Sequence, residues 1–565
     1  MKILQKIGLI SMVLVLLFSG CSNQKQENNL EVTPESATPI IENMKYPPMP
    51  VDSVATTQDK YRTYYEVFLY SFCDSNGDGI GDINGLISKL DYLNDNDCNT
   101  DTDLGITGIW LMPIMPSKSY HKYDVKDYFD IDSDYGTLEE FKTLIEECHK
   151  RDINVIIDFV FNHTSNLHPW FQEASTYLRT LSNDEQPKGS ECKYIEYYNF
   201  SKDKAMNDSF YQVDGTDWYY EAQFSSDMPD LNLSCDAVRL EIEAIASFWL
   251  ELGVDGYRLD AAKEYFTGSQ TKNIEVLNWF SSYVYGIKPE AYLVAEVWDS
   301  FGTIASYYQS GIDSIFNYAF GNSDGKLAST ANNAGNGKVG INLANNMKQV
   351  QDTFVSKNPN AIDASFLSNH DNNRVSSYVS YDEQLVKLLG GINLMMNGNS
   401  FIYYGEEIGM AGTGKDENKR APMFWSKQDL TGMTSGPVNM EKQTQRFPAV
   451  DEQSLDESSI INYYRRAIRL KNLNPEISRG TIEVIDVSDG DITAVKKSLE
   501  KTSVILLINI SAQEKQVLLN QDMNAYKGTL QALTTTAKQP VLEDNMIVLP
   551  PYAIVILRED NIPVK

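Results

Sequence analysis

The stretch DAVRLEIEAIASFWLELGVDGYRLDAA, residues 236–262, places two different periodicities one after the other and decides the fold class. Its first part, Asp236–Leu252, predicts an amphipathic helix, because apolar side chains recur at helical spacing at Val238, Leu240, Ile242, Ile245, Phe248, Trp249 and Leu252. Its second part, Val254–Ala262, is a short run of the kind that forms a buried strand. A helix that leads directly into a buried strand indicates a parallel α/β fold.

The same alternation runs along the chain from residue 61. Seven more short runs predict strands at Tyr64–Phe72, Gly105–Ile114, Asn154–His163, Ala291–Trp298, Ser314–Phe320, Ala361–Asp371 and Ser400–Met410. The segments between them predict helices, for example Thr137–Asp152 and Ser458–Asn472. Eight strands that alternate with helices predict a closed (β/α)8 TIM barrel, domain A, which we assign to residues 58–164 and 225–475.

Two segments depart from this rhythm. Residues 165–224 lack a helical period and are rich in aromatic side chains, so we expect an inserted domain B whose aromatic residues mostly form its own core. Residues 476–565 predict a C-terminal antiparallel β-sandwich, domain C, from the runs Thr481–Val487, Ile492–Ser498, Ser503–Ile510, Glu514–Asn520 and Met546–Leu557.

The N-terminus has the pattern of a targeting segment. Residues 1–20 combine a basic start with the apolar run Ile7–Phe18, which is typical of a signal peptide and too short to span a bilayer comfortably. Cys21 follows in a sequence that resembles a bacterial lipobox and predicts a lipid anchor, with plain secretion or an uncleaved anchor as the alternatives. Residues 21–57 are polar and predict a disordered tether. We therefore expect a monomer on the extracellular face of the cell envelope, attached to the membrane only through the lipid.

Charge and cysteine content narrow the class of partner. The formal net charge of −30 argues against nucleic acid and anionic membrane, which would repel the protein, whereas a neutral polysaccharide would not. The six cysteines show neither a disulfide framework nor a zinc pattern. We expect them to be mostly free and buried, and a Cys192–Cys235 bridge stays open as an alternative.

Polar residues cluster at the ends of four predicted strands, where catalytic groups lie in a parallel barrel. Arg258 and Asp260 are two residues apart, so both point to one face of their strand, and the guanidinium would keep the carboxylate ionised as a glycosidase nucleophile requires. Glu296 follows an apolar run, where poor solvation would raise its pKa and suit a general acid. Asp371 and His163 end two further runs. A structural ion pair explains Arg258 and Asp260 about as well, and a structural role explains Glu296 alone or a lone His better. Only the four strand ends together favour a catalytic site.

These segments resemble the conserved regions of the α-amylase family, glycoside hydrolase family 13, over residues 58 to 565. The matching stretches are Asp158–His163, Met228–Asn232, Gly256–Asp260, Glu296–Trp298 and Phe366–Asp371. The resemblance implies that Asp260 is the nucleophile, Glu296 the acid/base and Asp371 a third carboxylate that stabilises the transition state of a retaining glycosidase. It also implies that substrate is bound by His121, Tyr123, His163, Arg258, His370 and Trp298.

Two residues bear on the linkage that is cleaved. Ala261 follows the nucleophile, where α-1,6-cleaving relatives usually have Val, and Tyr120 stands where exo-acting relatives have Asp. Both favour endo-acting α-1,4 cleavage of starch and malto-oligosaccharides. The segment Met228–Asn232 is intermediate between the oligo-1,6-glucosidase and neopullulanase versions, so an enzyme of those types or a transglycosylase is an alternative, and a non-catalytic glucan-binding protein is the alternative outside enzymes.

The segment DSNGDGIGD, residues 74–82, predicts a calcium loop. Side-chain oxygens at Asp74, Asn76, Asp78 and Asp82, with the backbone carbonyl of Ile80, match the start of a calcium-binding pattern. A polar turn without metal is the alternative. The family resemblance also implies a second Ca²⁺ at Asn162 and Asp230, although Glu264 replaces the His that is usual near that site.

Overall fold

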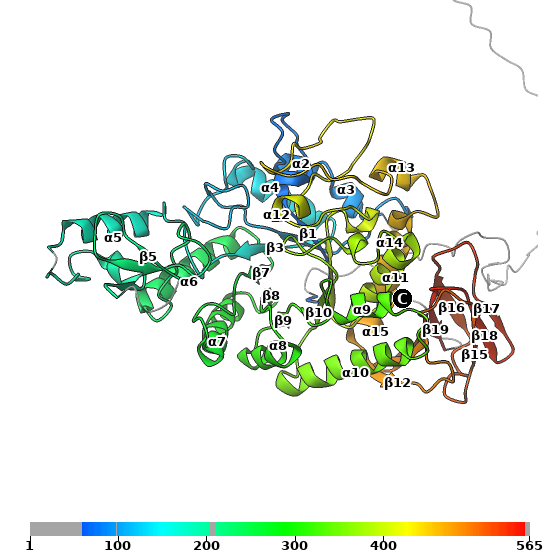
Figure 1. Ribbon diagram of the computed structural model, residues 1–565. Helices are drawn as coiled ribbons and strands as arrows, with labels where there is room; N and C mark the ends of the chain where they lie inside the picture. The colour runs from blue at the N-terminus through cyan, green and yellow to red at the C-terminus, as the bar shows by residue number, and fades with distance from the viewer. Residues whose placement is uncertain (1–58, 98, 183, 204–208, 560–565) are drawn as a thin grey trace, which may run out of the picture. The chain divides into compact units, whose positions relative to one another are not determined.

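The computed structural model describes residues 59–97, 99–182, 184–203 and 209–559. The predicted signal peptide, the lipidated Cys21, the tether and Cys98 lie outside the described residues. Strands and helices alternate along most of the described chain (Figure 1). Among the described residues, no helix combines the length and the apolar character needed to cross a lipid bilayer.

Eight parallel strands form the central sheet. They are β1 (Thr63–Val67), β2 (Gly108–Leu111), β3 (Asn154–Phe159), β7 (Gly256–Leu259), β8 (Tyr292–Ala295), β9 (Ser314–Ile315), β10 (Ala364–Phe366) and β11 (Asn399–Tyr403). Their order is β10-β11-β1-β2-β3-β7-β8-β9, and a parallel bridge between Phe316 and Ala364 joins the two end strands. The sheet therefore closes into the predicted barrel, with every strand at a predicted position but shorter than its apolar run.

Long helices follow the strands. They are α4 (Leu138–Lys150), α6 (Asp236–Glu251), α7 (Gln270–Ile287), α10 (Val339–Lys357), α11 (Glu383–Leu394) and α14 (Ile460–Leu473). Helix α4 begins at a capping box in which Thr137 and Glu140 satisfy each other's backbone N–H groups. Helix α6 buries Val238, Ile242, Ile245 and Trp249 as predicted, but Leu240 is 64% exposed and does not belong to the buried face.

Short helical segments fill the connections. They are α1 (Leu69–Phe72), α2 (Ile83–Ile87), α3 (Leu90–Leu93), α8 (Phe301–Tyr307), η3 (Tyr308–Ser310), α9 (Lys326–Asn332), η4 (Val375–Ser377), η5 (Glu406–Ile408), α12 (Asp416–Lys419), α13 (Val450–Ser454) and α15 (Pro475–Arg479).

The insertion after β3 differs from its prediction. It contains a twelve-residue helix, α5 (Pro169–Thr180), in a segment where we expected no helical period. The prediction was wrong because this helix buries only a narrow face, with Phe171, Ala174, Ser175 and Leu178. The 3₁₀ segment η1 (Lys193–Glu196) and a small sheet of β4 (Phe200–Ser201), β5 (Phe210–Gln212) and β6 (Tyr219–Glu221) complete it. Ring contacts between Phe171 and Tyr198 and between Phe171 and Tyr220 confirm that aromatic residues form the core of the insertion.

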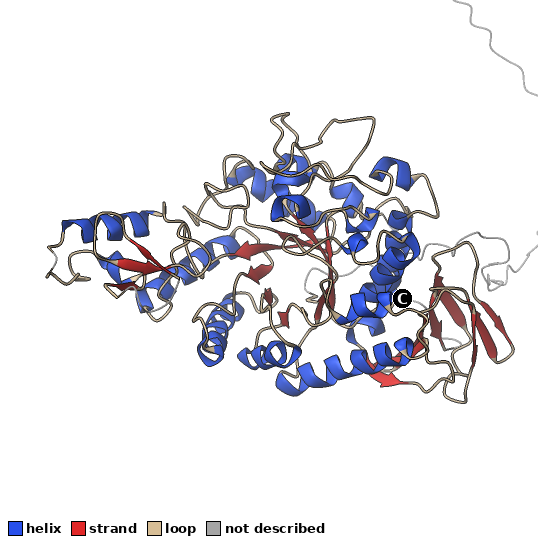
Figure 2. Cartoon of the chain, in the orientation of Figure 1, coloured by secondary structure: helices blue, strands red, loops and turns tan. Residues whose placement is uncertain are grey.

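The C-terminal segment forms two antiparallel sheets, as predicted (Figure 2). One contains β12 (Thr481–Val484), β13 (Ile492–Leu499), β14 (Thr502–Asn509), β16 (Thr529–Leu533) and β19 (Ile554–Arg558), and the other contains β15 (Lys515–Leu518), β17 (Val541–Glu543) and β18 (Met546–Leu549). The run Met546–Leu557 is two strands rather than one, because Pro550 and Pro551 cannot donate to a sheet ladder. Strands β16 and β17 were not predicted.

The cysteines that the structure describes are unpaired. Cys73 and Cys148 are free and buried, as expected. Cys192 and Cys235 are also free but only half-buried, so the bridge between them that the sequence left open is not formed.

Candidate active site

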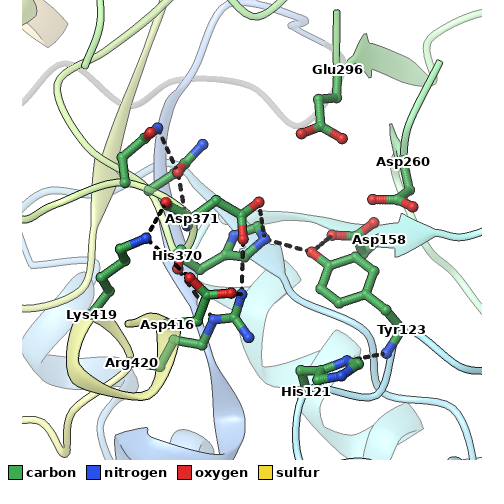
Figure 3. Close-up of polar contacts among 12 residues, drawn as sticks. His121, Tyr123, Asp158, Asp260, Glu296, His370, Asp371, Asp416, Lys419 and Arg420 are labelled. Atoms are coloured by element: carbon green, nitrogen blue, oxygen red, sulfur yellow. Dashed lines mark hydrogen bonds and ion pairs between the residues drawn. The ribbon is translucent and has the colours of Figure 1, made fainter. Parts of the chain in front are cut away.

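The predicted catalytic carboxylates meet at the carboxyl ends of the barrel strands. Asp260 directly follows β7, Glu296 directly follows β8, and Asp371 lies in the turn after β10. Figure 3 shows their carboxyl groups pointing towards a common space. This space is a cavity of about 240 Å³ lined by His121, Tyr123, His163, Phe224, Met228, Asp260, Ala261, Glu296, Asp371, Asp416 and Arg420.

A larger cavity, of about 570 Å³, lies beside α10 and β12. Of its two acids, Asp352 pairs with Lys348 at 2.8 Å and Asp363 accepts a hydrogen bond from Asn317 at 3.1 Å. No histidine lines this cavity and its two acids belong to separate contacts. The smaller cavity is the one that holds the converging acids.

Arg258 is buried in β7 and contacts three carboxylates. Its Nη1 lies 2.5 Å from Asp260 Oδ1 and 2.8 Å from Asp158 Oδ1, and its Nη2 lies 2.9 Å from Glu296 Oε2. The predicted contact of Arg258 with Asp260 is therefore confirmed, whereas the contacts with Asp158 and Glu296 were not foreseen. One guanidinium fixes the relative positions of the proposed nucleophile and acid.

The pKa of Asp260 is raised rather than held low. Burial raises it, and the neighbouring Arg258 opposes that rise without cancelling it. Arg258 therefore lowers the pKa of this carboxylate as expected, but burial has the larger effect. Burial also raises the pKa of Glu296, with the charges of Asp260 and Asp371 adding to the rise against Arg258, which agrees with the prediction of a general acid.

Asp371 lies between two cationic side chains (Figure 3). Its Oδ2 is 3.1 Å from His370 Nε2, and its Oδ1 accepts a hydrogen bond from Arg420 Nη2 at 2.8 Å. Burial alone would raise the pKa of Asp371, but the charges of His370 and Arg420 outweigh it and hold that pKa well below its usual range. Asp371 therefore stays ionised.

His370 is held in its charged form by carboxylates on both sides of the ring. Its Nδ1 lies 2.6 Å from Oε1 of Glu66, a buried residue of β1. Burial would lower the pKa of His370, but Asp371 and Glu66 together raise it to about 9. Both ring nitrogens then carry protons, so His370 donates to Glu66 and is a buried cation in contact with Asp371.

Tyr123 and the remaining predicted histidines line the same cavity. The Tyr123 hydroxyl donates to Asp158 Oδ2 at 2.9 Å and lies 2.8 Å from His370 Nε2. The Nδ1 atom of His121 accepts the N–H of Tyr123 at 3.2 Å, which leaves the proton of the neutral ring on Nε2 as a donor to a ligand. Burial lowers the pKa of both His121 and His163 to about 4, so both rings are neutral at pH 7.

Residues from distant segments complete the side of the site around Asp371. Arg420 also donates to the Tyr120 hydroxyl at 3.0 Å, and Lys419 donates to the backbone carbonyl of Asp371 at 2.7 Å. Asp416 also lines the cavity. Sequence reasoning missed Arg420, Lys419 and Asp416, because they lie 45 to 49 residues beyond Asp371 in a segment without a strand-end signal.

Aromatic side chains stand beside the acid. Trp298 is 46% exposed and stacks on Tyr318, with ring centroids 4.9 Å apart and planes at 15°. Phe224, at the end of the insertion, is 51% exposed and lies 5.5 Å from the ring of His163. Exposed rings of this kind can stack on sugar rings. Tyr318 and Phe224 were not singled out from the sequence.

The predicted calcium loop is curled around its own acids. Asp74 accepts the backbone N–H groups of Asn76, Gly77 and Gly79 at 3.0, 2.6 and 2.7 Å, and Asp82 accepts that of Ser75 at 2.8 Å. Within the residues that the structure describes, no three His, Cys, Asp or Glu side chains form a metal-binding group. The loop nonetheless offers only oxygen donors, and ionised carboxylates keep lone pairs beyond these hydrogen bonds, so its chemistry fits calcium.

The predicted second metal residues do lie together. Asn162 Nδ2 donates to Asp230 Oδ1 at 3.2 Å, and the other Asp230 oxygen accepts the N–H of Gln223 at 2.9 Å. Burial first, and then the charges of Glu221 and Glu264, raise the pKa of Asp230 to about 7. Glu264, which replaces the usual His, therefore places additional negative charge near this pair.

A comparison with protein families identifies the catalytic region. The family model described as alpha amylase, catalytic domain, matches residues 66–480. The chain is 38% identical to Alpha-amylase 3 of Dictyoglomus thermophilum over 502 residues, which cover 88% of this chain and 93% of that protein. It is 29% identical to an oligo-1,6-glucosidase of Parageobacillus thermoglucosidasius over 544 residues, which cover 80% of this chain and 90% of that protein.

Two solved structures are also similar to this chain over most of its length. The structure of Eubacterium rectale Amy13B is 43% identical, has a TM-score of 0.85, and is covered completely by 92% of this chain. An α-amylase from H. orenii is 35% identical, has a TM-score of 0.75, and is covered completely by 89% of this chain.

Proposed function

Because this chain belongs to the α-amylase family of glycoside hydrolases, we propose that it hydrolyses α-1,4-glucosidic bonds inside starch and malto-oligosaccharides with retention of configuration. One observation carries the proposal: Arg258 contacts both Asp260 and Glu296, and the ionised Asp371 lines the same cavity. An acid, a nucleophile and a third carboxylate are the groups that a retaining glycosidase needs.

The geometry supports a double displacement. Glu296, with its raised pKa, donates a proton to the glycosidic oxygen while Asp260 attacks the anomeric carbon and forms a glycosyl–enzyme ester. Glu296 then takes a proton from water, which attacks the anomeric carbon and releases Asp260. The ionised Asp371 and the neutral His121 and His163 face the sugar, so that the negative charge of Asp371 stabilises the oxocarbenium-like transition state.

Two features favour α-1,4 over α-1,6 cleavage. Ala261 lines the cavity next to the nucleophile, at the position where α-1,6-cleaving relatives usually have the larger Val. Tyr120 accepts a hydrogen bond from Arg420, and it adds no negative charge at the position where exo-acting relatives have Asp. A relative named Alpha-amylase 3 at higher identity than one named oligo-1,6-glucosidase agrees with this preference.

The test is a product analysis with matched variants. The wild-type protein should release a series of malto-oligosaccharides from amylose and maltoheptaose, with little action on pullulan or isomaltose. Asp260→Asn should lower turnover by orders of magnitude, whereas Asp255→Asn, in the segment before the same strand, should retain turnover because Asp255 pairs with His149 and Lys288 instead. Glucose from isomaltose as the main activity would identify an oligo-1,6-glucosidase, and glucan binding without any products would identify a non-catalytic protein.

We also propose that the enzyme is anchored to the extracellular face of the envelope through Cys21. The lipobox-like sequence around Cys21 supports this location. Cys21→Ala should move the protein from the membrane fraction to the medium, and incorporation of labelled fatty acid should disappear. An unchanged membrane fraction with no labelled lipid would refute the anchor.

We further propose that Ca²⁺ binds the loop at residues 74–82, and that Asn162 with Asp230 contributes a second site. The all-oxygen donor set of the loop supports the first, and the pairing of Asn162 with Asp230 supports the second. Chelation should lower the melting temperature of the wild-type protein and have less effect on Asp74→Asn. Equal sensitivity of the two proteins would refute binding at the loop.

A further inference from the structure

The two carboxyl oxygens of Glu296 have different surroundings. Oε2 accepts the backbone N–H of Ala261 at 2.9 Å and lies 2.9 Å from Arg258 Nη2. Oε1 contacts instead the hydroxyl of Tyr318 at 3.3 Å. An oxygen that already accepts an amide and a guanidinium proton is a poor place for a further proton, so the protonated form of Glu296 carries its proton on Oε1.

The direction of the hydrogen bond from Tyr318 is set by its other partner. Asn369 Nδ2 donates to the Tyr318 hydroxyl at 3.2 Å, which leaves the hydroxyl proton free for Glu296 Oε1. Burial raises the pKa of Tyr318 well above 10, so the hydroxyl keeps that proton at any pH at which the enzyme works. The Oδ1 atom of Asn369 in turn accepts the backbone N–H of Asp371 at 3.0 Å. A chain of hydrogen bonds thus joins the turn that carries Asp371 to the acid.

The ring of Tyr318 has a second contact. It stacks on Trp298, which lies two residues after Glu296 and is nearly half exposed. Glu296 protonates the oxygen of the departing sugar, so a ring platform beside it lies on the leaving-group side of the bond. One side chain therefore contacts the proton donor and an aromatic surface for the sugar that receives the proton.

We propose that Tyr318 is a positioning residue for acid catalysis: its hydroxyl orients Oε1 of Glu296, and its ring supports Trp298 as a platform for the leaving sugar. This inference rests on the proposed hydrolytic function. Tyr318 lies outside the predicted site, and through its two contacts it links binding of the leaving sugar by Trp298 to protonation of that sugar by Glu296.

The Tyr318 hydroxyl donates a hydrogen bond to Glu296, and this direction decides how its removal changes the pKa of Glu296. A hydroxyl that donates to Glu296 stabilises the ionised carboxylate, so its removal raises the pKa of Glu296. The other ionisable groups that face Glu296 are Arg258 from β7, Asp260 and Tyr265 from the segment after β7, and Asp371 from the turn after β10. Tyr318→Phe leaves all of them in place. The alkaline limb of kcat/KM, which reports loss of the acid proton, should move up by about one pH unit.

Tyr265→Phe is the matched control. Tyr265 is buried, and its hydroxyl has no hydrogen-bond partner among the described residues. Burial and then the charge of Asp260 raise the pKa of Tyr265, and Glu296 adds to that rise, so this hydroxyl senses the same acid without touching it. Its removal should leave the alkaline limb where it is.

The experiment compares both variants with the wild type on maltotetraose and on α-maltosyl fluoride, whose fluoride departs without a proton from Glu296. We expect Tyr318→Phe to lose about tenfold in kcat/KM on maltotetraose, a part of what general acid catalysis contributes, and to keep its kcat/KM on the fluoride. The comparison uses kcat/KM because this constant does not include the later attack of water, for which Glu296 is the base. Trp298→Ala should raise KM for maltotetraose without moving the limb. Thermal unfolding checks that each variant is folded.

An unmoved alkaline limb in Tyr318→Phe, or equal losses on the two substrates, overturns the inference and leaves the hydrolytic function intact. A wild-type protein inactive on both substrates overturns the proposed function itself. Equal shifts in Tyr318→Phe and Tyr265→Phe would show that any buried hydroxyl nearby has the same effect, and would also overturn the role of Tyr318.

Discussion

Replacement of Arg258 by Lys tests whether one guanidinium organises the site. The Nη1 atom of Arg258 contacts Asp260 and Asp158, and its Nη2 atom contacts Glu296. A lysine keeps the charge but offers a single nitrogen, which can take the place of Nη1 or of Nη2 but not of both. A hydrogen bond to a charged group contributes about 1.5–3 kcal/mol, so the loss of one such contact should lower kcat/KM by about 10- to 100-fold.

The assay is kcat/KM on maltoheptaose together with urea unfolding of the same proteins. Arg558→Lys is the matched control, because Arg558 is also buried and contacts Glu476 through Nη1 at 3.2 Å and Nη2 at 2.7 Å, but lies in β19, in the C-terminal sheets. It should lose stability and keep its activity. An Arg258→Lys variant with wild-type kcat/KM would refute the reasoning, as would an Arg558→Lys variant with the same loss of activity.

Three further predictions follow from the site. Glu296→Gln should lower kcat on maltoheptaose by about 10²- to 10⁴-fold, because it removes the proposed general acid, and added azide should not restore the rate, because azide cannot protonate the leaving group. Folding raises the pKa of His370 from 6.5 to about 9, which corresponds to about 3 kcal/mol in the free energy of unfolding. This contribution is fully present below pH 6.5 and is lost as the pH rises through 9. The difference in the free energy of unfolding between the wild type and His370→Gln should therefore shrink over that interval. Ala261→Val should lower activity on maltoheptaose more than Ala261→Gly does, because φ is +48° at this position, and equal activities of the two variants would contradict the role of the backbone there.

The barrel could be predicted from the sequence because its strands are buried on both faces. Apolar runs such as Asn154–His163 and Val254–Ala262 stand out against the amphipathic helices that separate them. The insertion could not be predicted in the same way. Helix α5 buries a narrow face, and the strands around it are only two or three residues long, so neither leaves a clear period in the sequence. Likewise, β17 has three residues with none fully buried.

The positions of the proposed catalytic acids were predictable for a different reason. Asp260 and Glu296 directly follow buried strands, so the position of the residue along its run already places it at the end of the barrel. The partners that tune these acids lie elsewhere. Glu66 is 304 residues from His370, and Arg420 is 300 residues from Tyr120, so only the closed barrel brings them together. Local patterns identify which side chains end strands, and long-range closure decides which charges they meet.

The different roles of the acids follow from how the cations are shared. Asp260 is buried and Glu296 and Asp371 are partly exposed, and burial by itself would raise the pKa of all three. Asp371 forms ion pairs with His370 and Arg420, and these two positive charges keep it ionised. Asp260 and Glu296 share the single guanidinium of Arg258 with Asp158, so the gain of a proton by one member of this group strengthens the hold of Arg258 on the others. Protonation of Glu296 therefore favours ionisation of Asp260, which is the pair of states that the first step of a retaining hydrolysis requires.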